Sequence, residues 1–246
     1  MQKIYLIKRN FSMENINSEI LGLLNSWKYK RAQPYKIARL KKIIEECVSN
    51  NLPIPLFGYW GIGNKKECNS YETDTICYLK SLVEKVKEIY APGLQIIFIL
   101  SDVHALNNCI PENITQNYAE KVKKLLEENG FQTVLLSDLY KKYNLSPKTV
   151  IENANENNKL WWQFFPLKKD LIKQAQNVSL CEDKNLSAKR YALIRKEELK
   201  FLEKEYLNKI FITYSSPHFK ILYPDLPTIY LYTEKKGCNI VPWFNN

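Results

Sequence analysis

Polar residues suited to proton transfer follow one short apolar run of the chain. Residues 101–108 read SDVHALNN and come directly after the apolar residues 94–100. Histidine changes charge near neutral pH, so we expect His104 to be a general acid or base and Asp102 to tune or orient it. A histidine that hydrogen-bonds the loop backbone explains His104 equally well. Two further polar residues of this segment are expected to contact a substrate, Ser101 and Asn108.

The second histidine of the chain is the other catalytic candidate. The sequence contains two histidines, and His218 follows a Ser-Ser-Pro loop. If the loops of His104 and His218 converge, both rings could line one site. No His-x-His or His-x-x-x-His spacing favours a metal, and no Gly-x-Ser-x-Gly elbow favours a serine nucleophile. We therefore predict no metal and no other cofactor.

Two parts of the sequence could bind an anionic substrate. Trp60 opens a glycine-containing loop that continues to Lys65 and Lys66, and its backbone N–H groups could face a phosphate. A tight turn packed beneath the aromatic residues is an equally good interpretation. Tyr191 and Arg195 stand four residues apart in a predicted helix, and this pair suits a carboxylate or phosphate. A surface arginine packed on an aromatic ring is the structural alternative.

The elements that would position these residues alternate between strands and amphipathic helices. The run 94–100 is typical of a strand buried on both faces of a parallel sheet. Ligands of such sheets bind beyond the carboxyl ends of the strands, where residues 101–108 would lie. We predict an α/β, Rossmann-like fold, a mostly parallel sheet with helices on both faces. The predicted strands are residues 3–8, 52–60, 94–100, 132–136, 210–214 and 228–233, and the main predicted helices are 13–29, 34–49, 72–90, 111–129 and 187–207.

The composition is that of an ordinary globular protein. We expect one α/β domain over residues 1–246, with an N-terminal helical segment at about 13–50 and a Rossmann-like core at about 51–246. No apolar stretch suits a membrane span or a signal peptide, so we expect a cytoplasmic protein without a membrane partner. The six cysteines show no paired spacing and are expected to be mostly reduced thiols. The net charge of +10 either attracts phosphates, on a sugar, a nucleotide or tRNA, or has no such role.

The order of these motifs resembles the isonitrile (isocyanide) synthase family over roughly residues 50–243. That family has Tyr-x-Pro-Gly before a buried strand and Ser-Asp-Gly-His after it. A helical Arg, a His-containing loop and Thr-Pro-Trp-His follow. The matching residues here are Tyr90, Pro92, Gly93, Ser101, Asp102, His104, Arg195, His218, Pro242 and Trp243. This chain departs from the family at three positions. Val103 stands in place of the Gly, Asn108 in place of an acidic residue at the end of the same segment, and Phe244 in place of the final His.

The resemblance implies a transferase or synthase of natural-product biosynthesis. Such an enzyme condenses the amine of an amino acid with the carbonyl of ribulose 5-phosphate, and the nitrogen ends as an isonitrile. Its partners would be an amino acid and a phosphorylated sugar. Asp102, His104 and His218 would serve catalysis, with Lys65, Lys66 and Arg195 binding phosphate or carboxylate.

Two other functions stay open at the level of the sequence. A tRNA-dependent cyclodipeptide synthase, which uses aminoacyl-tRNA, would also be basic, Rossmann-like and of this size. It requires a serine in a Gly-x-Ser pattern after an early strand, where this chain reads GYWGIGNKK. A non-catalytic nucleic-acid-binding protein would carry a stripe of Lys and Arg with interleaved aromatics, and residues 34–49 are the one candidate. The sequence leaves the amino acid used and the oligomeric state unpredicted.

Overall fold

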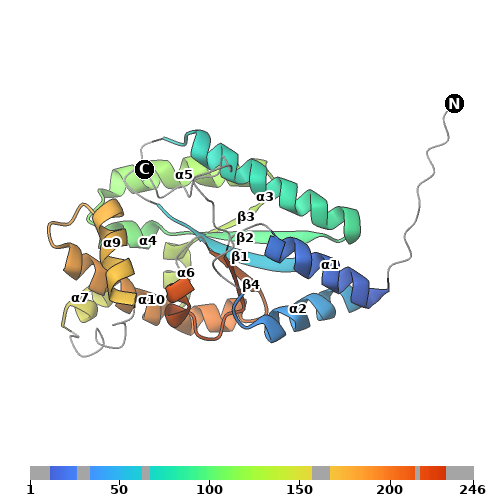
Figure 1. The fold of residues 1–246 in the computed structure, drawn as a ribbon. Helices are drawn as coiled ribbons and strands as arrows, with labels where there is room; N and C mark the ends of the chain where they lie inside the picture. Colours follow the sequence, from blue (N-terminus) through green and yellow to red (C-terminus); the bar gives the residue numbers. More distant parts are fainter. Residues whose placement is uncertain (1–11, 27–33, 63–66, 157–166, 214–216, 231–246) are drawn as a thin grey trace.

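The protein is built around a parallel sheet of five strands in the described part of the chain (Figure 1). A computed structural model describes residues 12–26, 34–62, 67–156, 167–213 and 217–230. The strands are β1 (Ile54–Trp60), β2 (Leu94–Leu100), β3 (Gln132–Leu135), β4 (Ile210–Thr213) and β5 (Thr228–Tyr230). Every strand pair is parallel, which confirms the predicted α/β, Rossmann-like fold.

The strand order reverses next to β1, at the centre of the sheet. The order is β3-β2-β1-β4-β5, so the chain first moves outward from β1 to β3 and then returns to the other side of β1. β1 pairs with β2 from Ile54↔Leu94 to Trp60↔Leu100 and with β4 from Leu56↔Ile210. At such a switch point the loops beyond the carboxyl ends of the strands diverge and leave room for a ligand.

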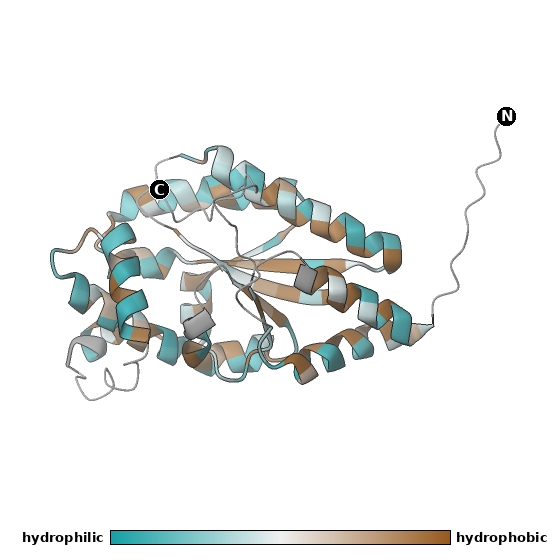
Figure 2. Ribbon diagram, in the orientation of Figure 1, coloured by the Kyte–Doolittle hydropathy of each residue, from teal (hydrophilic) through white to brown (hydrophobic). Residues whose placement is uncertain are grey.

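Helices cover both faces of the sheet. One core joins it to α1 (Met13–Ser26), α2 (Ile37–Ser49), α3 (Ser70–Ile89) and α5 (Glu112–Glu128). The other core joins it to α6 (Leu136–Lys142), α7 (Pro147–Glu156), α9 (Lys168–Val178), α10 (Lys184–Tyr206) and the 3-10 helix η2 (Pro217–Leu222). In Figure 1, α3 and α5 lie above the sheet and α10 lies below it. Figure 2 shows hydrophobic residues concentrated in the strands and hydrophilic residues along the outer helices.

The alternation of side chains along β1 separates the two cores. Leu56 and Trp60 face the α3 side, and Phe57 packs on the α10 side together with Tyr59. Between them, Gly58 lets β1 and β4 approach closely, since an added Cβ would lie 2.9 Å from the backbone oxygen of Ile212. The strand alternation therefore decides which aromatic residues can reach which face.

Most predicted elements are confirmed within a few residues, and two differ. The segment after β2 was expected to be a loop but forms the short helix α4 (Asp102–Asn107). Helix α10 begins at Lys184, three residues before its predicted start, because Asp183 caps it by accepting a hydrogen bond from the Leu186 N–H. The predicted strand 3–8 lies outside the described residues. No helix in the described ranges is both long and apolar enough to cross a membrane.

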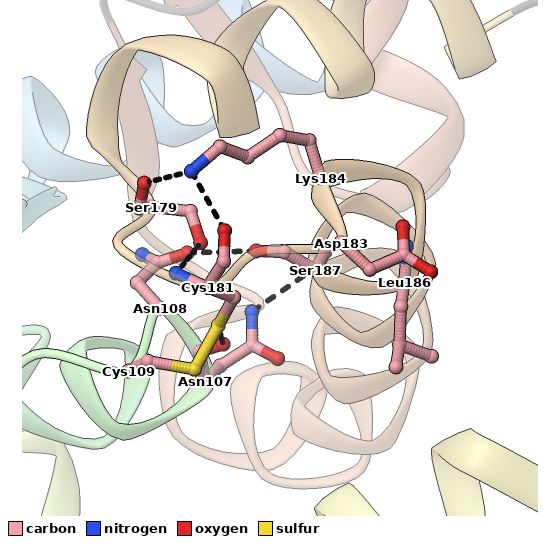
Figure 3. Close-up of a disulfide and its surroundings, with 9 residues drawn as sticks. All are labelled: Asn107, Asn108, Cys109, Ser179, Cys181, Asp183, Lys184, Leu186 and Ser187. Atoms are coloured by element: carbon pink, nitrogen blue, oxygen red, sulfur yellow. Dashed lines mark hydrogen bonds between the residues drawn. A yellow bond between two sulfur atoms is a disulfide. The ribbon is translucent and has the colours of Figure 1, made fainter.

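One pair of cysteines is bonded rather than reduced, which corrects the expectation from their spacing. Cys109 and Cys181 form a disulfide across 72 positions of sequence, with their Cα atoms 5.2 Å apart (Figure 3). The bond joins the end of α4 to the turn before α10. Beside it, the Leu180 N–H donates to the Asn108 carbonyl at 2.8 Å. The sequence could not reveal this pair because tertiary packing brings its two halves together. Cys47 and Cys77 are free thiols.

Candidate functional site

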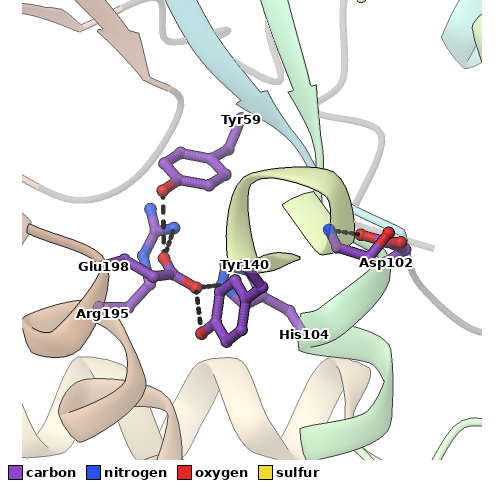
Figure 4. A network of polar contacts seen from close by, with 7 residues as sticks. Tyr59, Asp102, His104, Tyr140, Arg195 and Glu198 are labelled. Atoms are coloured by element: carbon purple, nitrogen blue, oxygen red, sulfur yellow. Dashed lines mark hydrogen bonds and ion pairs between the residues drawn. The ribbon is translucent and has the colours of Figure 1, made fainter. Parts of the chain in front are cut away.

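A buried carboxylate on α10 stands at the centre of a polar network (Figure 4). Oε1 of Glu198 lies 2.7 Å from Nε2 of His104 and accepts a hydrogen bond from the Tyr140 hydroxyl at 3.1 Å. Its other oxygen, Oε2, accepts from Nη1 of Arg195 at 2.8 Å and from the Tyr59 hydroxyl at 3.1 Å. Glu198 is fully buried, so these four groups replace the water that would otherwise solvate its charge.

Four elements bring this network together at the carboxyl edge of the sheet. Tyr59 comes from the α10 face of β1, and His104 comes from α4, directly beyond β2. Tyr140 comes from α6, which follows β3. Arg195 and Glu198 stand three residues apart on α10 and therefore share one helical face. The network thus lies where the strand order predicts a ligand site.

Aromatic rings enclose the guanidinium group of Arg195. Its central carbon lies 3.6 Å from the ring centre of Tyr59, 4.8 Å from that of Tyr223 and 5.6 Å from that of Tyr191. Tyr191 also meets the His104 ring edge-on, with the ring centres 5.4 Å apart. Such contacts favour a desolvated cation, and Arg195 is only 2% exposed.

Among the residues that the structure describes, two buried donors of this aromatic enclosure have no acceptor. Nε of Arg195 and the hydroxyl of Tyr223 make no hydrogen bond within the described part of the chain. A buried donor without an acceptor costs about 1–3 kcal/mol. These two atoms therefore indicate where an oxygen of a bound molecule would be favoured.

The electrostatics of the network favour an ionised Glu198. Burial on its own would raise the pKa of Glu198, but the neighbouring His104 and Arg195 lower it below its ordinary value. Burial, followed by the charge of Glu198, raises the pKa of Tyr140 and of Tyr59. Although burial opposes the charge of Arg195, Tyr191, Tyr59 and Glu198 raise its pKa. The network therefore holds an ionised acid, a permanent cation, two neutral phenols and an imidazole.

Asp102 does not contact His104, which corrects the expectation that it orients the ring. Its Oδ1 instead accepts a hydrogen bond from the backbone N–H of Ser137 at 3.0 Å, in the first turn of α6 (Figure 4). Because residues 102–107 are helical, side chains two positions apart point in different directions. Glu198 occupies the position beside His104 that the sequence suggested for Asp102.

The predicted substrate contacts divide between the network and its surroundings. Arg195 belongs to the network, and Tyr191 borders it. Ser101 is buried at the end of β2. Asn108 is buried near the disulfide, where Oδ1 accepts from the Ser187 hydroxyl at 3.2 Å (Figure 3). Trp60 was expected to contact the substrate. It is instead buried in the opposite core and does not join the network.

Three predicted site residues cannot be placed. Lys65 and Lys66 lie outside the described residues. His218 falls within η2, but its side chain is likewise outside the described part. Among the described residues, no three His, Cys, Asp or Glu side chains gather as a metal site.

Four residues of the site were missed from the sequence, namely Tyr59, Tyr140, Glu198 and Tyr223. A signal existed for Glu198, because Tyr191, Arg195 and Glu198 follow the i, i+4, i+7 spacing of one helical face. Ion pairs on such a face are usually solvated, so this pattern alone did not indicate a buried acid. The three tyrosines carried no distinguishing pattern, because their roles depend on tertiary packing.

The fold and the network define a Rossmann-like protein with a buried acid–base cluster beyond its sheet. The solved structures that share this fold include two that align at low sequence identity. PvcA from Pseudomonas aeruginosa aligns with a TM-score of 0.58 and 12% identity, over 93% of this chain and 88% of PvcA. Tyrosyl-tRNA synthetase from Archaeoglobus fulgidus, solved with L-tyrosine, aligns with a TM-score of 0.53 and 16% identity, over 88% of this chain and 64% of the synthetase.

The family of the chain follows from its sequence. Residues 72–218 match the pyoverdine/dityrosine biosynthesis protein family, and the chain belongs to that family. The matched range contains α4, α6 and α10, and therefore His104, Tyr140, Arg195 and Glu198. No curated protein matches the sequence.

Proposed function

We propose that this protein is an isonitrile-synthase-like enzyme that condenses the amine of an amino acid with the carbonyl of a sugar phosphate such as ribulose 5-phosphate. Membership of a biosynthetic family supports an enzyme of secondary metabolism. The observation that supports acid–base catalysis of this condensation is the buried His104–Glu198 pair beyond the carboxyl end of β2. A histidine held there by an ionised acid suits proton transfer in a condensation.

The first step of this reaction requires two proton transfers. The amine nitrogen attacks the sugar carbonyl, and a carbon–nitrogen bond forms as the carbonyl oxygen becomes a hydroxyl. His104 passes a first proton from the nitrogen to this oxygen and then a second proton from the nitrogen to the resulting hydroxyl, which leaves as water. An imine between the amino acid and the sugar results. This role agrees with a histidine that is 6% exposed and hydrogen-bonded through one nitrogen.

The substrate carboxylate would meet the two donors that have no acceptor among the described residues. Nε of Arg195 and the Tyr223 hydroxyl are both buried, and the Arg195 guanidinium lies 4.8 Å from the Tyr223 ring centre. A carboxylate oxygen would satisfy both donors.

Lys65 and Lys66 would bind the sugar phosphate, and His218 would line the opposite wall. Ser101, Asn108 and Tyr191 are the further substrate contacts in this proposal. Both substrates are cytoplasmic metabolites, so we propose that location as well.

The test is an assay of the purified protein with a mixture of amino acids and ribulose 5-phosphate. We expect a new isonitrile product in the wild type and a loss of at least about 100-fold with His104→Ala, on the scale of general acid–base catalysis. Formation of a cyclic dipeptide from aminoacyl-tRNA would support the cyclodipeptide synthase instead. Binding of RNA without any product, with a steep dependence on salt, would support a nucleic-acid-binding protein.

A further inference from the structure

We propose that Glu198 is a positioning residue that keeps the proton on Nε2 of His104, so that Nδ1 is the nitrogen that exchanges protons with the substrate. The inference rests on the proposed acid–base role of His104. It goes further because it names the reacting atom and assigns a task to an acid on another element of the fold.

The direction of the hydrogen bond follows from the chemistry of its two partners. Nε2 of His104 lies 2.7 Å from Oε1 of Glu198. An ionised carboxylate can only accept, so Nε2 must donate whether the imidazole is neutral or charged. In both states Nδ1 is the atom that gains or loses the proton. Within the described residues, Nε2 forms the one hydrogen bond of the ring.

The surroundings of Glu198 favour its ionised form. Tyr140 donates to the same oxygen as His104, while Arg195 and Tyr59 donate to the other oxygen. Each carboxylate oxygen therefore faces two donors. Arg195 can only donate, and a positive charge at 2.8 Å favours the ionised carboxyl over the protonated one. The titratable groups around Glu198 thus all favour an acceptor at this position.

Two rings restrain the plane of the imidazole. Tyr59 stacks on His104 with the ring centres 5.7 Å apart, and Tyr191 meets it edge-on at 5.4 Å. Tyr191 and Glu198 stand seven residues apart on one face of α10, so a single helix contacts both the ring and its Nε2. Two contacts from one rigid helix fix the ring direction as well as its tautomer.

The direct test is the nitrogen NMR spectrum of the protein labelled with ¹⁵N-histidine. The chain has two histidines, so His104→Gln assigns the spectrum by removing one imidazole. We expect the neutral His104 ring of the wild type to carry its proton on Nε2. In Glu198→Gln the amide presents one oxygen and one NH₂ group to the four donors, so we expect both tautomers of His104. A proton on Nδ1 in the wild type, or an unchanged spectrum in Glu198→Gln, would overturn the proposal.

A matched control exists on the opposite face of the sheet. Glu72 is also fully buried, and it accepts from the Tyr118 hydroxyl at 2.7 Å and from the Asn69 N–H at 2.7 Å. Glu72→Gln makes the same chemical change at the same burial, away from His104. We expect it to leave the His104 spectrum unchanged. A mixture of His104 tautomers in Glu72→Gln would show that a general loss of stability is enough to allow the second tautomer. The effect of Glu198→Gln could then not be assigned to the loss of the Glu198 carboxylate.

Kinetic measurements distinguish a positioning role of Glu198 from a purely structural one. We expect Glu198→Gln to lower kcat by about 10- to 100-fold with a smaller change in KM, and to shift the acid limb of the pH profile. Glu198→Asp keeps the charge and should recover part of kcat, whereas Glu72→Gln should keep the wild-type profile. Equal kcat in Glu198→Gln and the wild type would contradict the positioning role. If no substrate pair reacts, the proposed function fails, and the NMR result still decides the tautomer.

Discussion

Glu198 and Arg195 are buried charges that are stable only in each other's presence. Glu198 is fully buried and Arg195 is 2% exposed, and their hydrogen bond of 2.8 Å is supplemented by the contacts of Arg195 with aromatic rings. Removing one partner of a buried pair leaves the other without compensation. These residues therefore affect the stability of the protein as well as its chemistry.

Replacing the acid should destabilise the fold far more than replacing its neighbour. We expect Glu198→Ala to lower the free energy of unfolding by about 3–5 kcal/mol, because Arg195 stays buried without its carboxylate. Glu197→Ala is the control, since its ion pair with Lys200 is at the surface, where such pairs contribute about 0–1 kcal/mol. Denaturant unfolding measures both. Similar costs for the two variants would show that the buried pair adds no stability.

The lowered pKa of Glu198 gives stability a defined dependence on pH. The folded-state pKa lies below the ordinary value of 4.5, so the ionised acid stabilises the fold above that pH. This contribution should be lost as the pH falls from 4.5 through the folded-state pKa. Unfolding at several pH values between neutral and acid should give a smaller drop in Glu198→Gln than in the wild type. Parallel curves for the two proteins would contradict the assignment.

Single residues were predicted from the sequence only where local spacing carried the information. His104 was identified because it directly follows a recognisable buried strand. Its partner was assigned to Asp102, two positions away, whereas the structure supplies Glu198 from 94 positions away. Such a pairing between residues far apart in the sequence depends on how the helices pack against each other. The local spacing of residues in a single sequence does not predict this packing.

At the scale of elements, Asp102 joins two helices. It lies in the first turn of α4, and its carboxylate accepts from the Ser137 N–H at the start of α6. The first turn of a helix has unpaired N–H groups, and a side-chain acceptor satisfies one of them. Asp102 therefore holds α6, and with it Tyr140, against the sheet.

Loss of this cap should cost stability without removing the acid–base pair. We expect Asp102→Ala to lower the free energy of unfolding by about 1 kcal/mol, because one N–H of α6 loses its acceptor. Asp102→Asn keeps an oxygen acceptor and should lose less. The ¹⁵N spectrum of His104 should keep its Nε2 proton in both variants. A spectrum like that of Glu198→Gln would mean that Asp102, too, sets the tautomer.

The strands and long helices could be predicted from periodicity, but the short helix α4 could not. The apolar run of β2 matched the observed bounds Leu94–Leu100, because a fully buried strand has a strong local signal. The following segment was expected to be a loop, yet it forms α4, which is only six residues long. Such a short helix depends on its tertiary contacts, which the local pattern does not contain.

For the whole molecule, the disulfide connects the two elements that carry the acid–base pair. Cys109 follows the helix of His104, and Cys181 precedes the helix of Glu198. Hydrogen bonds run beside it from the Asn107 side chain to the Ser187 carbonyl at 3.3 Å and from Ser187 to Asn108. The bond thus stabilises the docking on which the site depends.

Reduction of this bond should destabilise the protein by an amount that depends mainly on the length of the chain between the two cysteines. A loop of 72 positions corresponds to about 4 kcal/mol in the chain-entropy estimate. We expect the paired substitution Cys109→Ser with Cys181→Ser to lower the free energy of unfolding, and a dithiol reductant to have the same effect on the wild type. Cys77→Ser, at an exposed free thiol, should change little. Insensitivity to reductant would mean that the pair is not bonded in solution.

The most direct measurement of the proposed reaction follows two labelled atoms into the product. The protein is incubated with a ¹⁵N-labelled amino-acid mixture and ribulose 5-phosphate labelled with ¹³C at its carbonyl, and the products are analysed by mass spectrometry and NMR. Condensation of the amine with that carbonyl predicts an isonitrile in which ¹⁵N is bonded to ¹³C, absent with His104→Ala. A product that contains the amino-acid nitrogen without the sugar carbon would contradict the proposed function.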